Sequence, residues 1–161
     1  MKRVADGLDT RLVEMDGLEM AALVEELAGR GVAARFVARG GSMSPWIRDG
    51  DVVTVTPLET AVSAGPGEVA AFKRPGSGRL TVHRLVRRVS EGWVARGDRL
   101  GGTDGVVADD EILGIVTRVE RRGREAFLPR GTAGLLLARL SRVVLDARQR
   151  LRTLARMGSG S

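Results

Sequence analysis

The chain contains no cysteine and only one histidine among its 161 residues. The absence of cysteine excludes disulfide bonds, cysteine-based zinc sites and thiol catalysis, and it leaves the redox compartment open. With a single histidine as well, we expect no metal site and no cofactor. Aromatic residues make up only 3% of the chain, so a hydrophobic core has to be built from valine, leucine, isoleucine and alanine.

Long apolar runs are also missing. No stretch approaches the ~18–20 residues that a helix needs to cross a bilayer. Residues 1–6 are charged and lack the apolar centre of a signal peptide. These absences predict a cytoplasmic protein, whose only expected contact with a membrane is a peripheral one at its surface.

Positive charge is concentrated near the C-terminus. The net charge is +6, and residues 132–157 carry six arginines against one aspartate, or +5. Apolar residues recur there on one helical face, with the arginines opposite: Leu136, Leu140, Val143, Val144, Leu151 and Leu154. The pattern predicts a basic amphipathic helix over residues 132–157, followed by a flexible tail at residues 158–161.

Such a helix has four alternative roles. It packs on the rest of the domain, lies on an anionic membrane surface, docks a partner protein or grips nucleic acid. No aromatic residues are interleaved with the arginines and no recognition helix is apparent, so nucleic acid is not an expected partner. The other three roles stay open at this point.

The rest of the chain divides into a helix and a run of short β segments. Residues 17–29 have apolar residues at helical spacing, with Asp16 as the N-cap, so we assign residues 1–31 to an N-terminal helical segment. Short β-rich stretches follow, separated by turns rich in glycine, proline and serine: residues 32–38, 51–57, 68–73, 79–89, 92–95, 113–121 and 125–128. This rhythm predicts a mainly β domain over residues 32–129, built as a small barrel or sandwich.

One serine and one histidine stand out as a candidate pair. Ser42 follows Gly40 and Gly41, in a turn that can present its hydroxyl group. A serine hydroxyl is a poor nucleophile at neutral pH until a neighbouring base takes its proton. Imidazole suits that task near pH 7, and His83 is the only histidine. A serine after two glycines is also common in ordinary turns, so the pair alone is a weak signal.

Ser42 and His83 belong to a series of five short sequence motifs, here called boxes. They are Ser42-Met43-Ser44-Pro45, Asp49-Gly50-Asp51, Gly67-Glu68-Val69-Ala70-Ala71-Phe72, Thr81-Val82-His83-Arg84-Leu85 and Arg96-Gly97-Asp98. In this order the boxes resemble the clan of signal peptidases I and LexA-type repressors, over roughly residues 34–122. The resemblance implies a coiled, β-barrel-like, mainly β domain with its site on an open groove.

The residue at the position of the catalytic base indicates which branch of the clan the chain resembles. Most bacterial members of this clan carry a lysine where this chain has His83. The histidine resembles the branch found in the endoplasmic reticulum, in archaea and in some sporulating bacteria. In that branch an acid completes a triad, and the family's spacing places it on Asp104, six residues beyond Asp98. Asp98 is the alternative acid, and otherwise a structural residue near the site.

The resemblance also implies a mechanism. His83 takes the proton of Ser42 as its hydroxyl attacks a peptide carbonyl, and Asp104 orients the imidazole. The backbone N–H of Ser42 holds the oxyanion, with Gly41 as a secondary residue of the site. Gly40 stands where many members of the family add a serine hydroxyl as a second oxyanion donor.

The substrate implied by the resemblance is a peptide or protein. Members of the family bind it as an added β strand, here beside residues 34–40 and the strand of His83. They prefer small residues before the cut. The expected substrate-binding residues are Phe36, Ala38, Met43 and Val82.

The leading hypothesis is a serine endopeptidase of signal-peptidase type that cleaves a leader or partner peptide. The chain departs from that family because we find no N-terminal transmembrane segment in it. One alternative is a LexA-like regulator that cleaves itself, for which Ala28-Gly29 resembles the cleaved dipeptide. Another is a degenerate module that binds peptides without cutting them. Lys73 is an alternative base, Ser44 is an alternative hydroxyl, and residues 109–111 are expected to form a solvated acidic turn.

Overall fold

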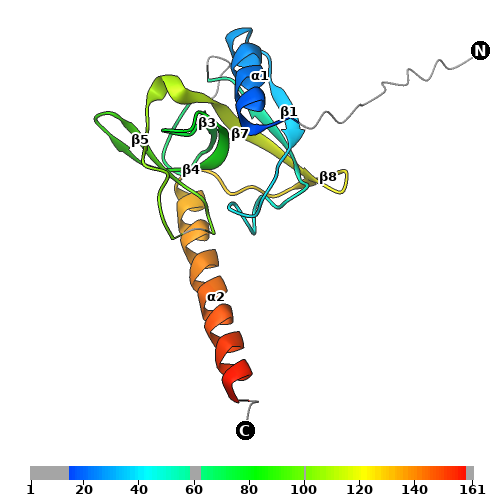
Figure 1. The fold of residues 1–161 in the computed structure, drawn as a ribbon, viewed down its shortest axis with the longest axis vertical. Helices are drawn as coiled ribbons and strands as arrows, with labels where there is room; N and C mark the ends of the chain where they lie inside the picture. The colour runs from blue at the N-terminus through cyan, green and yellow to red at the C-terminus, as the bar shows by residue number, and fades with distance from the viewer. Residues whose placement is uncertain (1–14, 59–62, 100, 159–161) are drawn as a thin grey trace, which may run out of the picture.

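The computed structural model of the chain describes residues 15–58, 63–99 and 101–158. Within those residues the fold is mainly β: eight strands form one curled half-barrel sheet, with a helix before it and a helix after it (Figure 1). The elements are α1 (Gly17–Gly29), β1 (Ala34–Val37), β2 (Val52–Thr56), β3 (Val69–Lys73), β4 (Leu80–Val89), β5 (Gly92–Arg96), β6 (Val106–Val107), η1 (Asp109–Glu111), β7 (Ile112–Arg121), β8 (Arg124–Ala126) and α2 (Gly131–Gly158). The predicted fold class is confirmed.

The sheet is antiparallel and bent. Its strands are ordered β1-β2-β7-β3-β4-β5-β6, and β8 pairs with β7. The register shifts where β2 meets β7, where β3 meets β7 and where β4 meets β5. Such irregularities bend a strand and increase its twist, which is why the long strands β4 and β7 wrap the sheet into a half-barrel.

The central strand β3 is buried on both of its faces. Val69 and Ala71 belong to one hydrophobic cluster, whereas Ala70 and Phe72 belong to a second. Alternate residues of a strand point to opposite faces, so this continuous apolar run suits a strand with a core on each side. Strand β4 lies next to β3, and His83 pairs directly opposite Ala70. The sheet therefore places His83 on a well-packed central element.

Helix α1 packs against β1, β4 and β7. Its N-terminus carries a capping box: the Asp16 carboxylate accepts hydrogen bonds from the backbone N–H groups of Leu18 and Glu19, and the Glu19 carboxylate accepts one from the Asp16 N–H. On its inner side, Val24 joins Ala34 in a third hydrophobic cluster. The predicted helix and its N-cap are both confirmed.

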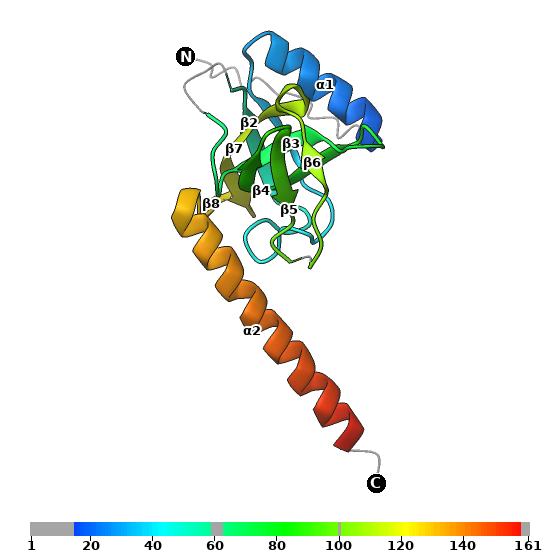
Figure 2. The same ribbon diagram turned by 90° about the vertical axis from the view of Figure 1, so that its left-hand side faces the viewer.

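Helix α2 is 28 residues long and projects away from the β domain (Figures 1 and 2). Its first turns are held against the domain, where Gly134 and Ala138 are buried. The apolar face predicted for this helix is exposed, with exposed fractions of 60% at Leu136, 62% at Leu140, 66% at Val143, 50% at Val144 and 66% at Leu151. Packing of that face on the β domain, one of the predicted roles, is therefore wrong for these residues. The Leu154 side chain and residues 159–161 of the predicted tail lie outside the described residues.

The short strand β6 is not anticipated by the sequence pattern, because two residues are too few to show alternation. The predicted acidic turn at residues 109–111 is confirmed as the single turn η1, in which Asp109 and Asp110 are exposed. Two predicted strands change most at their ends, since residues 32–38 shorten to Ala34–Val37 and residues 125–128 become Arg124–Ala126. Within the described ranges, neither helix combines the length and the apolar character that crossing a membrane requires.

Candidate active site

Ser42 lies in a tight turn that follows β1. Gly40 adopts φ +83°, a backbone conformation that favours glycine, and its N–H donates to Asp49 Oδ1 over 2.9 Å. The turn closes where the Ser44 N–H donates to the Gly41 carbonyl oxygen over 3.1 Å. The next side chain, Met43, is only 4% exposed and belongs to a core cluster. The turn is thus fixed at both ends, and Ser42 is held on a rigid support.

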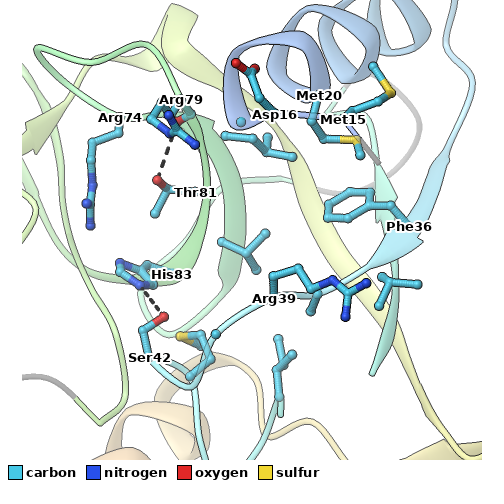
Figure 3. A pocket seen from close by; sticks show the side chains of 18 residues that line it. Met15, Asp16, Met20, Phe36, Arg39, Ser42, Arg74, Arg79, Thr81 and His83 are labelled. Carbon is cyan, nitrogen blue, oxygen red and sulfur yellow. Dashed lines mark hydrogen bonds between the residues drawn. The ribbon is translucent and has the colours of Figure 1, made fainter. Parts of the chain in front are cut away.

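His83 reaches this turn from the middle of β4. Its side chain is 3% exposed, and the Phe72 ring packs edge-on against the imidazole. The Nε2 atom of His83 lies 2.8 Å from the Ser42 Oγ atom (Figure 3). The structure therefore brings the predicted nucleophile and the predicted base into hydrogen-bond contact.

Asp104 completes a linear arrangement. It lies between β5 and β6, where its backbone N–H donates to the Ala95 carbonyl oxygen over 3.0 Å. Its Oδ2 atom is hydrogen-bonded to His83 Nδ1, and its side chain is only 6% exposed. Ser42, His83 and Asp104 thus stand in series, and a carboxylate on Nδ1 favours the tautomer in which Nε2 accepts the serine proton.

Arg74 is a member of this group that the sequence did not reveal. It lies in the turn between β3 and β4, and its Nη2 atom donates to Asp104 Oδ1. Asp104 therefore accepts from His83 on one carboxylate oxygen and from Arg74 on the other. Arg74 precedes a proline in a surface turn, and the sequence gives no signal that it folds back toward an acid placed thirty residues later.

A glycine allows the close approach of the serine and histidine. A Cβ atom at Gly97 would lie 2.8 Å from the Ser42 carbonyl oxygen and 3.1 Å from His83 Nε2. Two residues later, the Arg99 N–H donates to the same Ser42 carbonyl oxygen over 2.8 Å. The segment after β5 therefore packs directly on the serine backbone, and it has room to do so only without a side chain at position 97.

Asp98, the alternative acid, has a different partner. Its two carboxylate oxygens accept from Arg84 Nε over 2.8 Å and from Arg84 Nη2 over 2.7 Å. Arg84 is 1% exposed, and its Nη1 atom also donates to the carbonyl oxygens of Gly67 and Pro129, each over 2.7 Å. Asp98 is thus the partner of a buried arginine, and the acid beside His83 is Asp104.

A groove of about 590 Å³ begins at the serine and histidine. The predicted substrate-binding residues Phe36, Ala38, Met43 and Val82 all line it. Met43 is nearly buried, so it contributes to the wall and offers little surface to a ligand. Met15 and Asp16, just before α1, and Met20 in its first turn also line the groove (Figure 3), and no sequence pattern indicated this.

The alternative residues lie elsewhere. The Lys73 ammonium group donates to Glu25 of α1 over 2.8 Å, and this hydrogen bond raises the pKa of Lys73, so the amine stays protonated. Ser44 does not line the groove. The dipeptide Ala28-Gly29 lies in the last turn of α1, where the Ala28 carbonyl oxygen accepts from the Gly31 N–H over 2.9 Å. Cleavage at that bond would require the end of α1 to unwind and enter the groove.

No known protein family matches the chain by its sequence profile, and no curated protein matches it significantly. What the site does chemically therefore has to follow from its own geometry. A serine hydroxyl bonded to an imidazole, whose other nitrogen meets a buried carboxylate, is the arrangement that activates serine for acyl transfer.

Proposed function

We propose that the protein is a serine endopeptidase similar to signal peptidase I, in the branch that uses a histidine base. The observation that supports this most directly is the serial contact of Ser42, His83 and Asp104 at one end of an open groove. Ser42 and His83 belong to two of the five sequence boxes, and Asp104 lies six residues beyond Asp98 of the last box, as the resemblance implies. No metal or cofactor is needed for this chemistry.

The proposed reaction begins with proton transfer from Ser42 Oγ to His83 Nε2. As Oγ attacks the peptide carbonyl, Asp104 stabilises the imidazolium cation that forms, and Arg74 holds the second oxygen of Asp104. His83 then protonates the leaving amine, and water releases the acyl group by the reverse sequence of proton transfers. The enzyme is regenerated with Ser42 protonated.

The oxyanion donor in this proposal is the Ser42 backbone N–H. A second donor two residues earlier is lacking, because Gly40 has no hydroxyl and its own N–H is bonded to Asp49. Losing one donor of this kind typically lowers the rate by about 10²–10³-fold. We therefore propose a slow peptidase.

The groove suits an extended peptide. Strand β1 is an edge strand of the described sheet, and the first part of β4, Leu80 to His83, pairs with β3 on one side only. Both strands line the groove, so a substrate backbone placed between them would find N–H and C=O groups on each side. Phe36 and Val82 supply apolar wall, which favours small apolar side chains next to the cut.

A fluorophosphonate label tests the proposal. We expect one covalent adduct, located by mass spectrometry on Ser42, and cleavage of an Ala-x-Ala peptide that Ser42→Ala abolishes. Ser44→Ala is the matched control, because it removes a hydroxyl two residues away that does not line the groove. Absence of the adduct together with binding of the uncut peptide would identify a peptide-binding module. A chain that cuts itself at raised pH would identify a self-cleaving regulator.

We also propose that the protein is cytoplasmic and that α2 lies on an anionic membrane surface. Five apolar residues of α2 are each at least half exposed, and the same helix carries arginines beside them. Basic amphipathic helices of this kind bury their apolar face at the boundary of the lipid headgroups. Flotation with phosphatidylcholine vesicles that contain phosphatidylglycerol should retain the chain. Leu136→Gln with Leu140→Gln should reduce retention, and equal retention of this double variant would contradict the proposal.

A further inference from the structure

A second cavity, of about 390 Å³, lies between α2 and the β domain. It is separate from the groove at Ser42, and the two share no lining residue. The cavity is bounded by the end of β4 and β5, by the segment that follows β5 and by one side of α2. Its walls are Val86, Arg96, Arg99, Gly101, Arg139, Arg142, Val143 and Asp146.

Four of these residues are arginines, and we name them the arginine pocket: Arg96, Arg99, Arg139 and Arg142. Among the described residues, none of the four side chains makes a hydrogen bond or an ion pair, whereas Arg84, Arg88 and Arg121 each hold an aspartate. Asp146 is the one acid in the walls of the cavity. The lining therefore carries four positive charges against one negative charge.

Three of the four charges, on Arg96, Arg139 and Arg142, are close enough to interact. The pKa of Arg96 is lowered by its burial first and then by the nearby Arg142, with a further contribution from Arg139. Asp98 acts in the opposite direction, but its carboxylate is already bound by Arg84. Like charges held together at a partly buried position repel each other, and a bound anion would relieve that repulsion.

We propose that the arginine pocket binds the phosphate group of an organic ligand. Guanidinium groups present paired N–H donors that match phosphate oxygens, and several of them around one cavity suit a dianion better than a single carboxylate. The volume lies within the range of about 300–1,000 Å³ typical of ligand sites, so it holds more than a bare phosphate ion. Among the described residues, the apolar side chains of the wall are those of Val86 and Val143, and none is aromatic, which suits an aliphatic phosphate and not a nucleobase.

Titration of the full chain with inorganic phosphate at constant ionic strength tests the site. We expect calorimetry to show phosphate binding that chloride does not reproduce. The double variant Arg139→Gln with Arg142→Gln should weaken that binding by about tenfold or more, since each charge-assisted hydrogen bond contributes substantially. The matched control is Arg148→Gln with Arg150→Gln, which removes the same charge from the same helix outside the cavity and should bind phosphate as the unchanged chain does.

Two outcomes would overturn the proposal. One is phosphate binding no tighter than chloride binding, and the other is an equal loss in the two double variants, which would indicate a general charge effect. Circular dichroism checks that each variant retains its helices, and Arg142→Lys, which keeps the charge but loses the paired donors, should bind phosphate more weakly than the unchanged chain.

The source of the phosphate group is decided by two further probes. Glycerol phosphate represents a soluble ligand, and phosphatidylcholine vesicles containing phosphatidic acid represent a lipid headgroup. If the Arg139 and Arg142 variant loses glycerol phosphate but floats with these vesicles as the matched control does, the ligand is soluble. If it loses both, the pocket holds a lipid headgroup. Either result supports the site, and none of these readouts depends on peptidase activity at Ser42.

Discussion

His83 and Arg84 are neighbours on β4, and the contrast between their two sides of the sheet explains much of the molecule. Adjacent residues of a strand point to opposite faces, so the two side chains diverge. His83 meets Asp104 and Ser42 at the end of the groove. Arg84 meets Asp98 in the interior and also binds two backbone carbonyls. Asp98 and Asp104, six residues apart in the sequence, therefore have different partners, Arg84 and His83.

The comparison shows that a buried charged side chain does not have to belong to the proposed catalytic site. Arg84 and Asp98 are buried as deeply as His83, but all of their bonds are internal and none lines the groove. Arg84 ties β4 to the segments that carry Gly67 and Pro129, the second of which leads into α2. The His83 side carries out the proposed reaction, and the Arg84 side fixes the strand from which His83 projects.

The strongest way to separate the two sides is to replace His83. We expect His83→Gln to lower the rate of Ser42 acylation by about 10⁴–10⁶-fold, because the serine loses its base. Glutamine is close in size to histidine, so the melting temperature should change little. Stopped-flow labelling together with calorimetry measures both quantities. Labelling at an unchanged rate would show that His83 is not the base.

Replacing the acid on the other side should give the opposite result. Asp98→Ala leaves Arg84 buried without its counter-charge, and we expect a loss of about 3–5 kcal/mol in the free energy of unfolding. Urea denaturation measures this loss. At temperatures where the variant is folded, Ser42 labelling should stay near its original rate. Asp109→Ala, which breaks the exposed pair with Arg88, is the control and should leave stability nearly unchanged.

Replacing Gly97 tests how closely the segment after β5 has to pack against Ser42 and His83. In Gly97→Ala the new methyl group meets the Ser42 carbonyl and His83 Nε2, and we expect the shift to reduce kcat/KM for the Ala-x-Ala peptide by about 10²-fold. Gly101→Ala is the matched control on the same connection, since a Cβ there meets nothing within 4 Å. Equal kinetics in the two variants would mean that the site tolerates the displacement.

Arg74 extends the His83 side by one more contact. Losing its charge-assisted hydrogen bond to Asp104 should lower kcat by about tenfold in Arg74→Gln, with little change in KM. Arg79→Gln, in the same turn and also lining the groove, should leave kcat unchanged. Partial recovery in Arg74→Lys would support a positioning role. A change confined to KM would indicate that Arg74 contacts substrate instead.

Lys73 should give the smallest effect. Lys73→Gln removes the partly exposed ion pair with Glu25, which contributes at most about 1 kcal/mol to stability. Peptide cleavage should remain within about twofold of the original rate, because this ammonium group has no contact with Ser42. Loss of activity comparable to that of His83→Gln would reassign the base.

Local sequence patterns predicted much of the fold, because hydrophobic periodicity and helix caps involve residues that are close together in the sequence. The helix that Asp16 begins and the strand of His83 could both be recognised in this way. The acid beside His83 was suggested by a family resemblance and not by periodicity. The role of Arg84 had no signal at all, since an arginine in a strand ordinarily faces solvent. The bond from Arg74 to Asp104 joins two loops, and no local pattern reports such a contact.

The direction of α2 is another feature that local sequence patterns do not predict. Its apolar stripe was apparent from the spacing of residues such as Leu140 and Val143. Whether the stripe is covered depends on the direction in which the helix leaves the domain, and that direction is set by contacts around Pro129, Gly134 and Arg84. These contacts lie far apart in the sequence, so they could not be read from it.

The presence of one imidazole in the whole chain gives the site a built-in spectroscopic reporter. Every histidine ring signal in a nuclear magnetic resonance spectrum of this protein comes from His83. The nitrogen shifts of that ring distinguish which nitrogen carries the proton. A titration would therefore follow the tautomer and charge of the proposed base directly, without resonance assignment, labelling at a chosen position or background from other rings.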